Sequence, residues 1–391
     1  MDKQALRNDT PGASLHAHLN NAGASLPPSA VIQAVANYLQ EEALHGGYEV
    51  AAAKAAEIAG FYDTTARLIG AAPNNIAFAS SATDAYFRAL SSVQFEPGDV
   101  ILTTDDDYVS NQIAFIFLEK RFKVQLVRAA KLPEGGVDPQ SMEELVKRHR
   151  PKLVAVAHVP TNSGLVQDVE AVGQICRENG ILYLVDACQS AGQIPLDVEK
   201  IGCDFLAATM RKWLRGPRGA GFLFVSDKAL AAGMEPIFPD MAGGVWTSPN
   251  EYRQEPSAKR YEQWEKNYAL LLGAKAAMNY AMELGLENIE REVTGLAAYT
   301  RQKLAEIPGA KVLDRGSRKC GIVTVHFDGK NPDTVKKALD EANVHAGVGT
   351  PINALIDFRE KGIDWALRIS PHYYNTTAEI DLAIHALAGI S

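Results

Sequence analysis

Short, mostly apolar runs recur along the first two thirds of the chain, and segments of helical pattern lie between them. The runs begin near Ile76 and occupy residues 100–104, 124–127, 153–159, 181–185, 205–209 and 221–225. Apolar runs of this length are typical of parallel strands that are buried on both faces. The helical patterns occupy residues 29–40, 48–68, 111–119, 139–148 and 169–179. This alternation predicts an α/β fold with a mostly parallel, seven-stranded sheet flanked by helices.

The pattern changes near residue 262, where we expect a long helix over residues 261–284 that leads into a smaller α+β domain. The chain is therefore predicted to contain an N-terminal arm (1–28), a large domain (29–262) and a small C-terminal domain (263–391). Residues 18–28 of the arm should be extended, because paired asparagines, a glycine and two prolines oppose a helix.

Composition restricts the class of protein. The 391 residues are 47% hydrophobic and 22% charged, which allows sizeable cores, and the net charge of −8 offers no basic surface for nucleic acid or an anionic membrane. Four cysteines without a CxxC spacing indicate neither a disulfide framework nor a zinc site, so no metal is predicted. No signal peptide or membrane-spanning run is visible, and we expect a cytoplasmic protein.

Polar residues that follow two adjacent apolar runs carry the candidate chemistry. Asp186 and Gln189 come after the run at 181–185, and Thr209 and Lys212 end or follow the next one. Parallel sheets bind ligands beyond the carboxyl ends of their strands, so these side chains are expected to meet in one crevice. A lysine and a carboxylate placed in this way are the two anchors of pyridoxal 5'-phosphate (PLP).

The segments Asp-Ala-Cys-Gln at 186–189 and Thr-Met-Arg-Lys at 209–212 resemble those of the class V aminotransferase family, within PLP fold type I. The family includes cysteine desulfurases, isopenicillin N epimerase and ergothioneine sulfoxide lyases. The resemblance implies that Lys212 bonds to the PLP aldehyde, that Asp186 keeps the pyridine nitrogen protonated, and that Gln189 binds the phenolic oxygen. Thr209 and Arg211 would lie near the phosphate, at positions where relatives commonly carry serine and histidine.

Further cofactor contacts follow from the same resemblance. Ser81, Ala82 and Thr83 begin a predicted helix, whose free N–H groups suit the PLP phosphate. Tyr108 occupies the place of a histidine that stacks on the pyridine ring in relatives such as the desulfurases, and its ring can supply the same flat face.

Two other loops match the family, and each leaves a question open. One of Thr161 and Asn162 should meet the cofactor or the substrate, and the sequence does not choose between them. The glycine-rich segment 243–247 resembles a turn that crosses a dimer interface, so Thr247 is expected to reach the neighbouring subunit's phosphate and the protein to form a homodimer.

The substrate is expected to be a small amino acid. Arg368 matches a family arginine that binds the substrate α-carboxylate in a bidentate geometry, which suits a guanidinium group. Asn21 in the arm is the residue expected nearest the substrate. The loop at 344–357, where desulfurases carry the cysteine that accepts sulfur, contains no cysteine.

These features favour a PLP-dependent C–S lyase that eliminates a sulfur group from the β-carbon of a cysteine conjugate or sulfoxide, as in the ergothioneine lyases. Lys212 would act as the base on the Cα proton, with Asp186 and Tyr108 as the other catalytic residues. An epimerase or an aminotransferase of class V is the alternative, because both share these first steps. A nucleotide binder is disfavoured, since neither GxGxxG nor GxxxxGK[ST] occurs, and a catalytically silent relative is the remaining alternative.

Overall fold

The computed structural model describes residues 1–390, and its largest element is a seven-stranded sheet. The strand order is β2-β8-β7-β6-β5-β3-β4, and β8 runs antiparallel to both of its neighbours, β2 and β7, while the other pairs are parallel. This arrangement confirms the predicted α/β class. The strands are β2 (Ile76–Ala79), β3 (Val100–Thr103), β4 (Gln125–Arg128), β5 (Leu153–Ala157), β6 (Leu182–Asp186), β7 (Phe205–Thr209) and β8 (Gly221–Val225).

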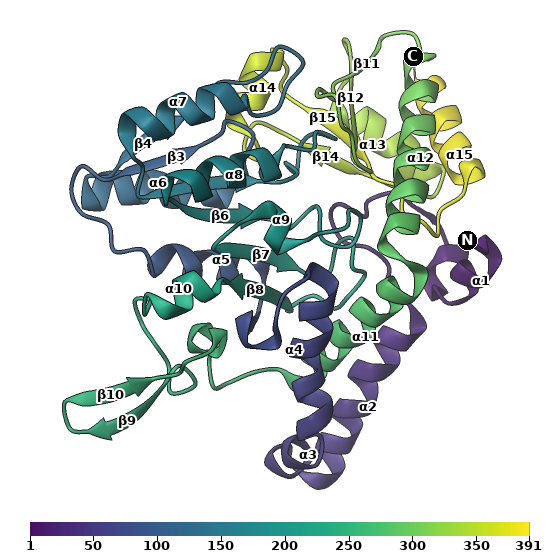
Figure 1. Ribbon diagram of the computed structural model, residues 1–391. Helices are drawn as coiled ribbons and strands as arrows, with labels where there is room; N and C mark the ends of the chain where they lie inside the picture. Colours follow the sequence, from purple (N-terminus) through teal and green to yellow (C-terminus); the bar gives the residue numbers. More distant parts are fainter. Residues whose placement is uncertain (391) are drawn as a thin grey trace.

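Both faces of the sheet are covered, as Figure 1 shows. Side chains alternate between the faces of a strand, so Val154 and Val156 pack with helices α7 and α8, while Leu153 and Ala155 pack with α5 and α6. Two buried faces explain why these strands are continuous apolar runs rather than alternating ones. The helices around the sheet are α5 (Ala82–Ser91), α6 (Val109–Phe122), α7 (Pro139–His149), α8 (Val169–Asn179), α9 (Val198–Ile201) and α10 (Asp227–Ala231).

The N-terminal helices and the long connecting helices differ from expectation at two places. The helix expected over 48–68 is divided at Lys54 into α3 and α4. The helix expected from residue 261 begins only at Tyr268, because Glu262 is extended and its carboxylate accepts hydrogen bonds from Phe78 N and the Tyr62 hydroxyl. The helices concerned are α1 (Lys3–Asn8), α2 (Ser29–His45), α3 (Gly47–Ala53), α4 (Ala55–Ile69), α11 (Tyr268–Leu284) and α12 (Leu286–Ala305).

The C-terminal part contains a four-stranded sheet in the order β11-β12-β15-β14. It packs with α12, α13 and α15 around a separate apolar core that includes Val325, Leu339 and Leu387. The elements of this part are β11 (Ala310–Val312), β12 (Val323–Phe327), α13 (Pro332–Glu341), β13 (Val344–His345), β14 (Gly347–Gly349), α14 (Leu355–Lys361), β15 (Ala366–Ile369) and α15 (Thr377–Ala388).

Two further segments matter for function. The N-terminal arm adds strand β1 (Ala17–His18) in parallel to β13, so the start of the chain lies beside the C-terminal part. The segment around Gly243 forms a hairpin, β9 (Gly244–Ser248) and β10 (Glu251–Gln254), which projects from the body in Figure 1. No helix within residues 1–390 combines the length and the apolar character needed to cross a membrane.

Candidate active site

Two adjoining cavities lie at the carboxyl ends of β5, β6 and β7. We call the cavity that reaches Asp186 the inner cavity and the one that reaches Arg368 the outer cavity; Tyr108, Thr161, Arg211 and Lys212 line both. The outer cavity has a volume of about 220 Å³. The inner cavity is also lined by Ser81, Ala82, Thr83, Asn111, Cys188, Gln189 and Thr209.

Lys212 lies in the loop after β7 and is buried. Burial lowers the pKa of its amine, and the charges of Arg211 and Arg368 lower it further, while Cys188 and Asp186 act in the opposite direction. A lower pKa increases the fraction of neutral amine, which is the form that attacks a carbonyl carbon or accepts a proton.

Asp186 is the last residue of β6, and it is fixed by two hydrogen bonds. Its carboxylate accepts from Cys188 N at 2.8 Å and from Asn111 Nδ2 at 3.0 Å. Asn111 also donates to Asp107 at 3.0 Å. Burial raises the pKa of Asp186, and burial together with the Asp186 charge raises the pKa of Asp107 to about 7. A bound cation beside Asp186 would offset this desolvation cost.

Asn111 is a site residue that sequence reasoning missed. It lies in the first turn of α6, three residues after Tyr108, so both side chains face the sheet edge. The spacing from Tyr108 was the available signal.

The N-terminus of α5 lines the inner cavity and offers free backbone N–H groups. Ser81 is the N-cap and its hydroxyl accepts from Asp84 N at 3.1 Å, so the N–H groups of Ala82 and Thr83 have no partner within the helix. A Cβ on Gly221 would lie 2.8 Å from the Ser81 carbonyl carbon, so only glycine lets β8 approach this turn. The turn suits an anion.

Gln189 and Thr161 connect the inner cavity to its surroundings. Gln189 Nε2 donates to the Ala22 carbonyl at 3.1 Å and to Thr161 Oγ1 at 3.2 Å, and Gln189 Oε1 accepts from Trp213 at 2.9 Å. Asn162 lines only the outer cavity, and its amide donates to Asp357 at 2.5 Å. The structure therefore separates the two residues that the sequence left equivalent, with Thr161 at the junction of the cavities.

Thr209 and Arg211 line the inner cavity, but their polar groups are engaged. The Thr209 hydroxyl is 3.4 Å from the Ala220 carbonyl, and an Arg211 N–H donates to the Gly23 carbonyl of the arm. Arg211 therefore places its positive charge at the cavity, and its hydrogen bond to Gly23 ties the arm to the large domain.

Arg368 projects from β15 into the outer cavity and has only neutral partners. Its guanidinium donates to the Thr161 carbonyl at 3.0 Å, to Thr161 Oγ1 at 2.9 Å and to Asn20 Oδ1 at 3.3 Å, and its buried Nε–H has no partner. No acidic side chain within residues 1–390 forms an ion pair with it. Burial, followed by the charge of Arg211, lowers its pKa to about 10, so it stays positive at neutral pH.

Two expected site residues do not line either cavity in this chain. Asn21 is buried and its amide donates to the Ser370 carbonyl at 2.8 Å, so it anchors the arm, and its neighbour Asn20 is the residue that contacts Arg368. Thr247 is exposed on the hairpin, where its hydroxyl donates to the Glu251 carbonyl at 3.2 Å. The structure brings the remaining expected residues together at the two cavities.

The inner cavity fits PLP on three counts. It combines a buried lysine of lowered pKa, a carboxylate at a strand end, and a helix N-terminus with unused N–H groups. These are the groups that would hold the aldehyde, the protonated ring nitrogen and the phosphate.

Comparisons with known proteins identify the family. The family model described as Aminotransferase class-V matches residues 17–382. A probable cysteine desulfurase of Methanothermobacter thermautotrophicus is 29% identical over 100% of this chain and 98% of its own. The apo cysteine desulfurase of Thermococcus onnurineus NA1 is 26% identical, with a TM-score of 0.92 and coverage of 99% and 97%. The cystine C-S lyase C-DES, in complex with its product cysteine persulfide, has the same fold at 22% identity, with a TM-score of 0.85 and coverage of 97% and 99%. The chain therefore belongs to the aminotransferase class-V family of PLP-dependent, fold type I enzymes.

Proposed function

We propose that this chain is a C–S lyase that eliminates a sulfur group from the β-carbon of a cysteine conjugate or cysteine sulfoxide. The observation that carries the proposal is the guanidinium of Arg368, which lines the outer cavity beside Lys212 and has only neutral partners. Arg368 is half-buried, and a cation withdrawn from water without an acidic partner is costly unless a ligand supplies the anion. An α-carboxylate fits this place, because guanidinium and carboxylate groups pair in a bidentate geometry.

The residues of the site have separate roles in the reaction. PLP, when bound, supplies an electron sink for the negative charge that develops at Cα. Lys212 takes the Cα proton on Nζ, which its lowered pKa makes available as a base. The Asp186 carboxylate would stabilise the positive charge of the protonated ring nitrogen. The Cβ–S bond then breaks with its electron pair on sulfur, and hydrolysis yields pyruvate and ammonium.

The cysteines of the chain support elimination over persulfide formation. The segment 344–357, part of which lines the outer cavity, contains none. Cys176, Cys203 and Cys320 are buried, and burial raises the pKa of each thiol. Cys188 lines the inner cavity next to Lys212, and burial raises its pKa as well. A persulfide route needs an accessible thiolate, and the three buried cysteines do not offer one. Cys188 is half-buried and lines the inner cavity, so a Cys188→Ser variant tests its involvement.

Product analysis tests the proposal. The purified enzyme is incubated with L-cysteine, S-substituted cysteines and their sulfoxides, and the products are identified. A lyase yields pyruvate and ammonium from the conjugates, and a Cys188→Ser variant keeps that activity. Alanine with protein-bound sulfur would show a desulfurase instead. Racemised substrate, or an aminated keto acid without pyruvate, would show that the epimerase or aminotransferase alternative is correct.

We also propose that the active unit is a homodimer. The hairpin and the preceding loop carry large exposed apolar side chains, with Phe238 and Trp246 85% and 79% exposed, and Ile113 and Phe117 on α6 are exposed as well. Apolar groups of this size are costly in water and favour burial against a partner. In a two-fold dimer with its contact here, the hairpin would extend toward the neighbouring subunit. Thr247 could then reach that subunit's phosphate, as the family resemblance implies.

A further inference from the structure

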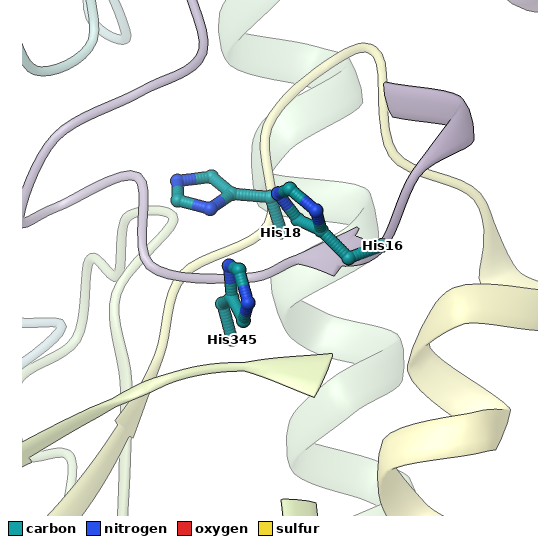
Figure 2. A group of neighbouring side chains, drawn as sticks. All are labelled: His16, His18 and His345. Carbon is teal, nitrogen blue, oxygen red and sulfur yellow. The ribbon is translucent and has the colours of Figure 1, made fainter. Parts of the chain in front are cut away.

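Three histidines from two distant segments lie on one face of the β1–β13 ribbon. Strand β1 pairs in parallel with β13, and His18 is directly opposite His345. His16 precedes β1 by one residue, and residues two apart along an extended chain point to the same side. Figure 2 shows the three side chains close together, with His16 and His18 on the arm and His345 on the neighbouring strand. One ring nitrogen from each residue lies within 4.8 Å of the other two.

The ring of His18 is prepared to act as a ligand. Its Nε2 lies 2.7 Å from the Ala24 carbonyl oxygen, which can only accept, so Nε2 carries the proton. In the neutral ring Nδ1 therefore bears a lone pair, and this atom is buried without a hydrogen-bond partner. Histidines that bind metals commonly donate their other ring N–H to a carbonyl in this manner, which fixes the tautomer and the ring orientation.

The other two rings can complete the set. The His16 and His345 rings are 4.0 Å apart between centroids, and their planes are tilted by 32°. Tetrahedral zinc with Zn–N bonds of about 2.1 Å requires ligand nitrogens about 3.4 Å apart. His345 is exposed and His16 is half-buried, so both rings can rotate to close the remaining gap.

One acidic residue, Glu379, interacts electrostatically with both His16 and His18. It is also the partner of Arg7 in an ion pair at 2.9 Å.

We propose that His16, His18 and His345 form a binding site for a divalent transition-metal ion, with Zn²⁺ as the expected occupant. Imidazole nitrogens suit zinc and the other late first-row metals, and solvent would supply the remaining ligand. The residues come from opposite ends of the chain, so the ion joins the N-terminal arm to β13. No metal was expected from the sequence, because local spacing does not reveal histidines that lie so far apart along the chain.

The position of the site gives it a role in holding the arm. Two residues beyond His18, Asn20 contacts Arg368, and Ala22 and Gly23 line the outer cavity. Two residues beyond His345, β14 begins and pairs with β15 at Arg368. A bound ion would therefore restrain both segments that flank the guanidinium. Metal binding itself does not depend on the proposed lyase function.

Calorimetric titration tests the proposal with ZnCl₂ and the PLP-loaded protein, prepared without a histidine tag. We expect one equivalent of Zn²⁺ per chain and a rise in the thermal midpoint on binding. His345→Gln and His16→Gln each remove one exposed or half-exposed ligand, and each should weaken binding by at least about 10-fold, since even the loss of an outer-sphere partner costs that much.

His45→Gln is the matched control, because His45 is exposed at the end of α2 and lies outside the histidine cluster. It should bind Zn²⁺ as the parent does. Titration without saturation at one equivalent would overturn the proposal. So would unchanged affinity in both histidine variants, which would place the ion elsewhere, for example at Cys188, and leave an adventitious ion only.

Discussion

Arg368 of β15 donates hydrogen bonds to both the carbonyl (3.0 Å) and the hydroxyl (2.9 Å) of Thr161, a residue 207 positions earlier in the chain. The same hydroxyl accepts from Gln189 at 3.2 Å, at the edge of the inner cavity. The C-terminal sheet and the loop after β5 thus share one polar contact at the junction of the two cavities. Binding of a carboxylate at Arg368 is thereby linked to the groups expected to hold the cofactor.

Arg368→Ala should lower kcat/KM for cysteine conjugates about 30- to 1,000-fold, because the substrate carboxylate would be desolvated without a partner. This factor corresponds to a loss of about 2 to 4 kcal/mol of transition-state stabilisation. Arg368→Lys should fall between the parent and the alanine variant, since ammonium keeps the charge and loses the bidentate geometry. Steady-state kinetics measure both.

Arg148→Ala is the control for this pair, because Arg148 is an exposed arginine of α7. Equal kcat/KM values in the parent and Arg368→Ala would show that Arg368 does not bind the substrate carboxylate.

Lys212→Ala should abolish turnover and the visible absorption band of the lysine-bound cofactor that borohydride bleaches, because the amine at the end of β7 is lost. Absorption spectra before and after reduction provide the measurement. Lys147→Ala, on the exposed face of α7, should leave both unchanged. A Lys212→Ala protein that still gave a reducible band at full occupancy would place the anchor at another residue.

Asp186→Asn should keep that reducible band and lose at least about 100-fold in kcat, because a neutral amide no longer stabilises positive charge at the ring nitrogen. The variant therefore separates cofactor attachment from carbanion chemistry. Single-turnover kinetics together with the spectrum measure the two properties. Undiminished turnover would contradict the role given to Asp186.

Asp107 should make the stability of the cofactor-free protein depend on pH. Burial raises its pKa from 3.8 to about 7 in the folded protein, so the folded state holds a proton that the unfolded state has released. Its stabilising contribution is complete below about pH 4 and is lost as the pH rises to about 7, at a limiting slope of about 1.4 kcal/mol per pH unit.

Asp107→Asn should remove this slope, because the amide does not titrate. Urea unfolding of both proteins between about pH 5 and pH 8 gives the difference in unfolding free energy, which should favour the variant as the pH increases. A constant difference across that range would show that Asp107 does not titrate there.

Trp246→Asp and Phe238→Asp should each shift the protein toward the monomer, because a carboxylate would be buried without a partner at the proposed contact. Sedimentation velocity over a range of concentrations measures the association. Leu382→Asp, on the exposed side of α15, is the control for an exposed apolar side chain elsewhere. An active monomer at working concentration in the parent would rule out the dimer proposal.

Several parts of the fold and site were predictable because local sequence is sufficient for them. A strand buried on both faces needs an unbroken apolar run, and the runs that end at Asp186 and Thr209 form β6 and β7 as expected. The carboxyl ends of adjacent parallel strands meet at one sheet edge, so the sequence already placed Asp186 and Lys212 together. The family resemblance and the cofactor rest on these short segments.

Tertiary structure decided what depends on contacts between distant segments. Bridging of Asn20 with Ser370 sets the register of the arm, and that register directs Asn20 toward Arg368 and buries Asn21. The helix after residue 261 starts late because Glu262 bonds to Phe78, a contact that outweighs helix propensity. The three histidines lie together because β1 and β13 pair in parallel. Packing of the whole fold brings these strands together from opposite ends of the chain, so no local sequence pattern reveals the cluster.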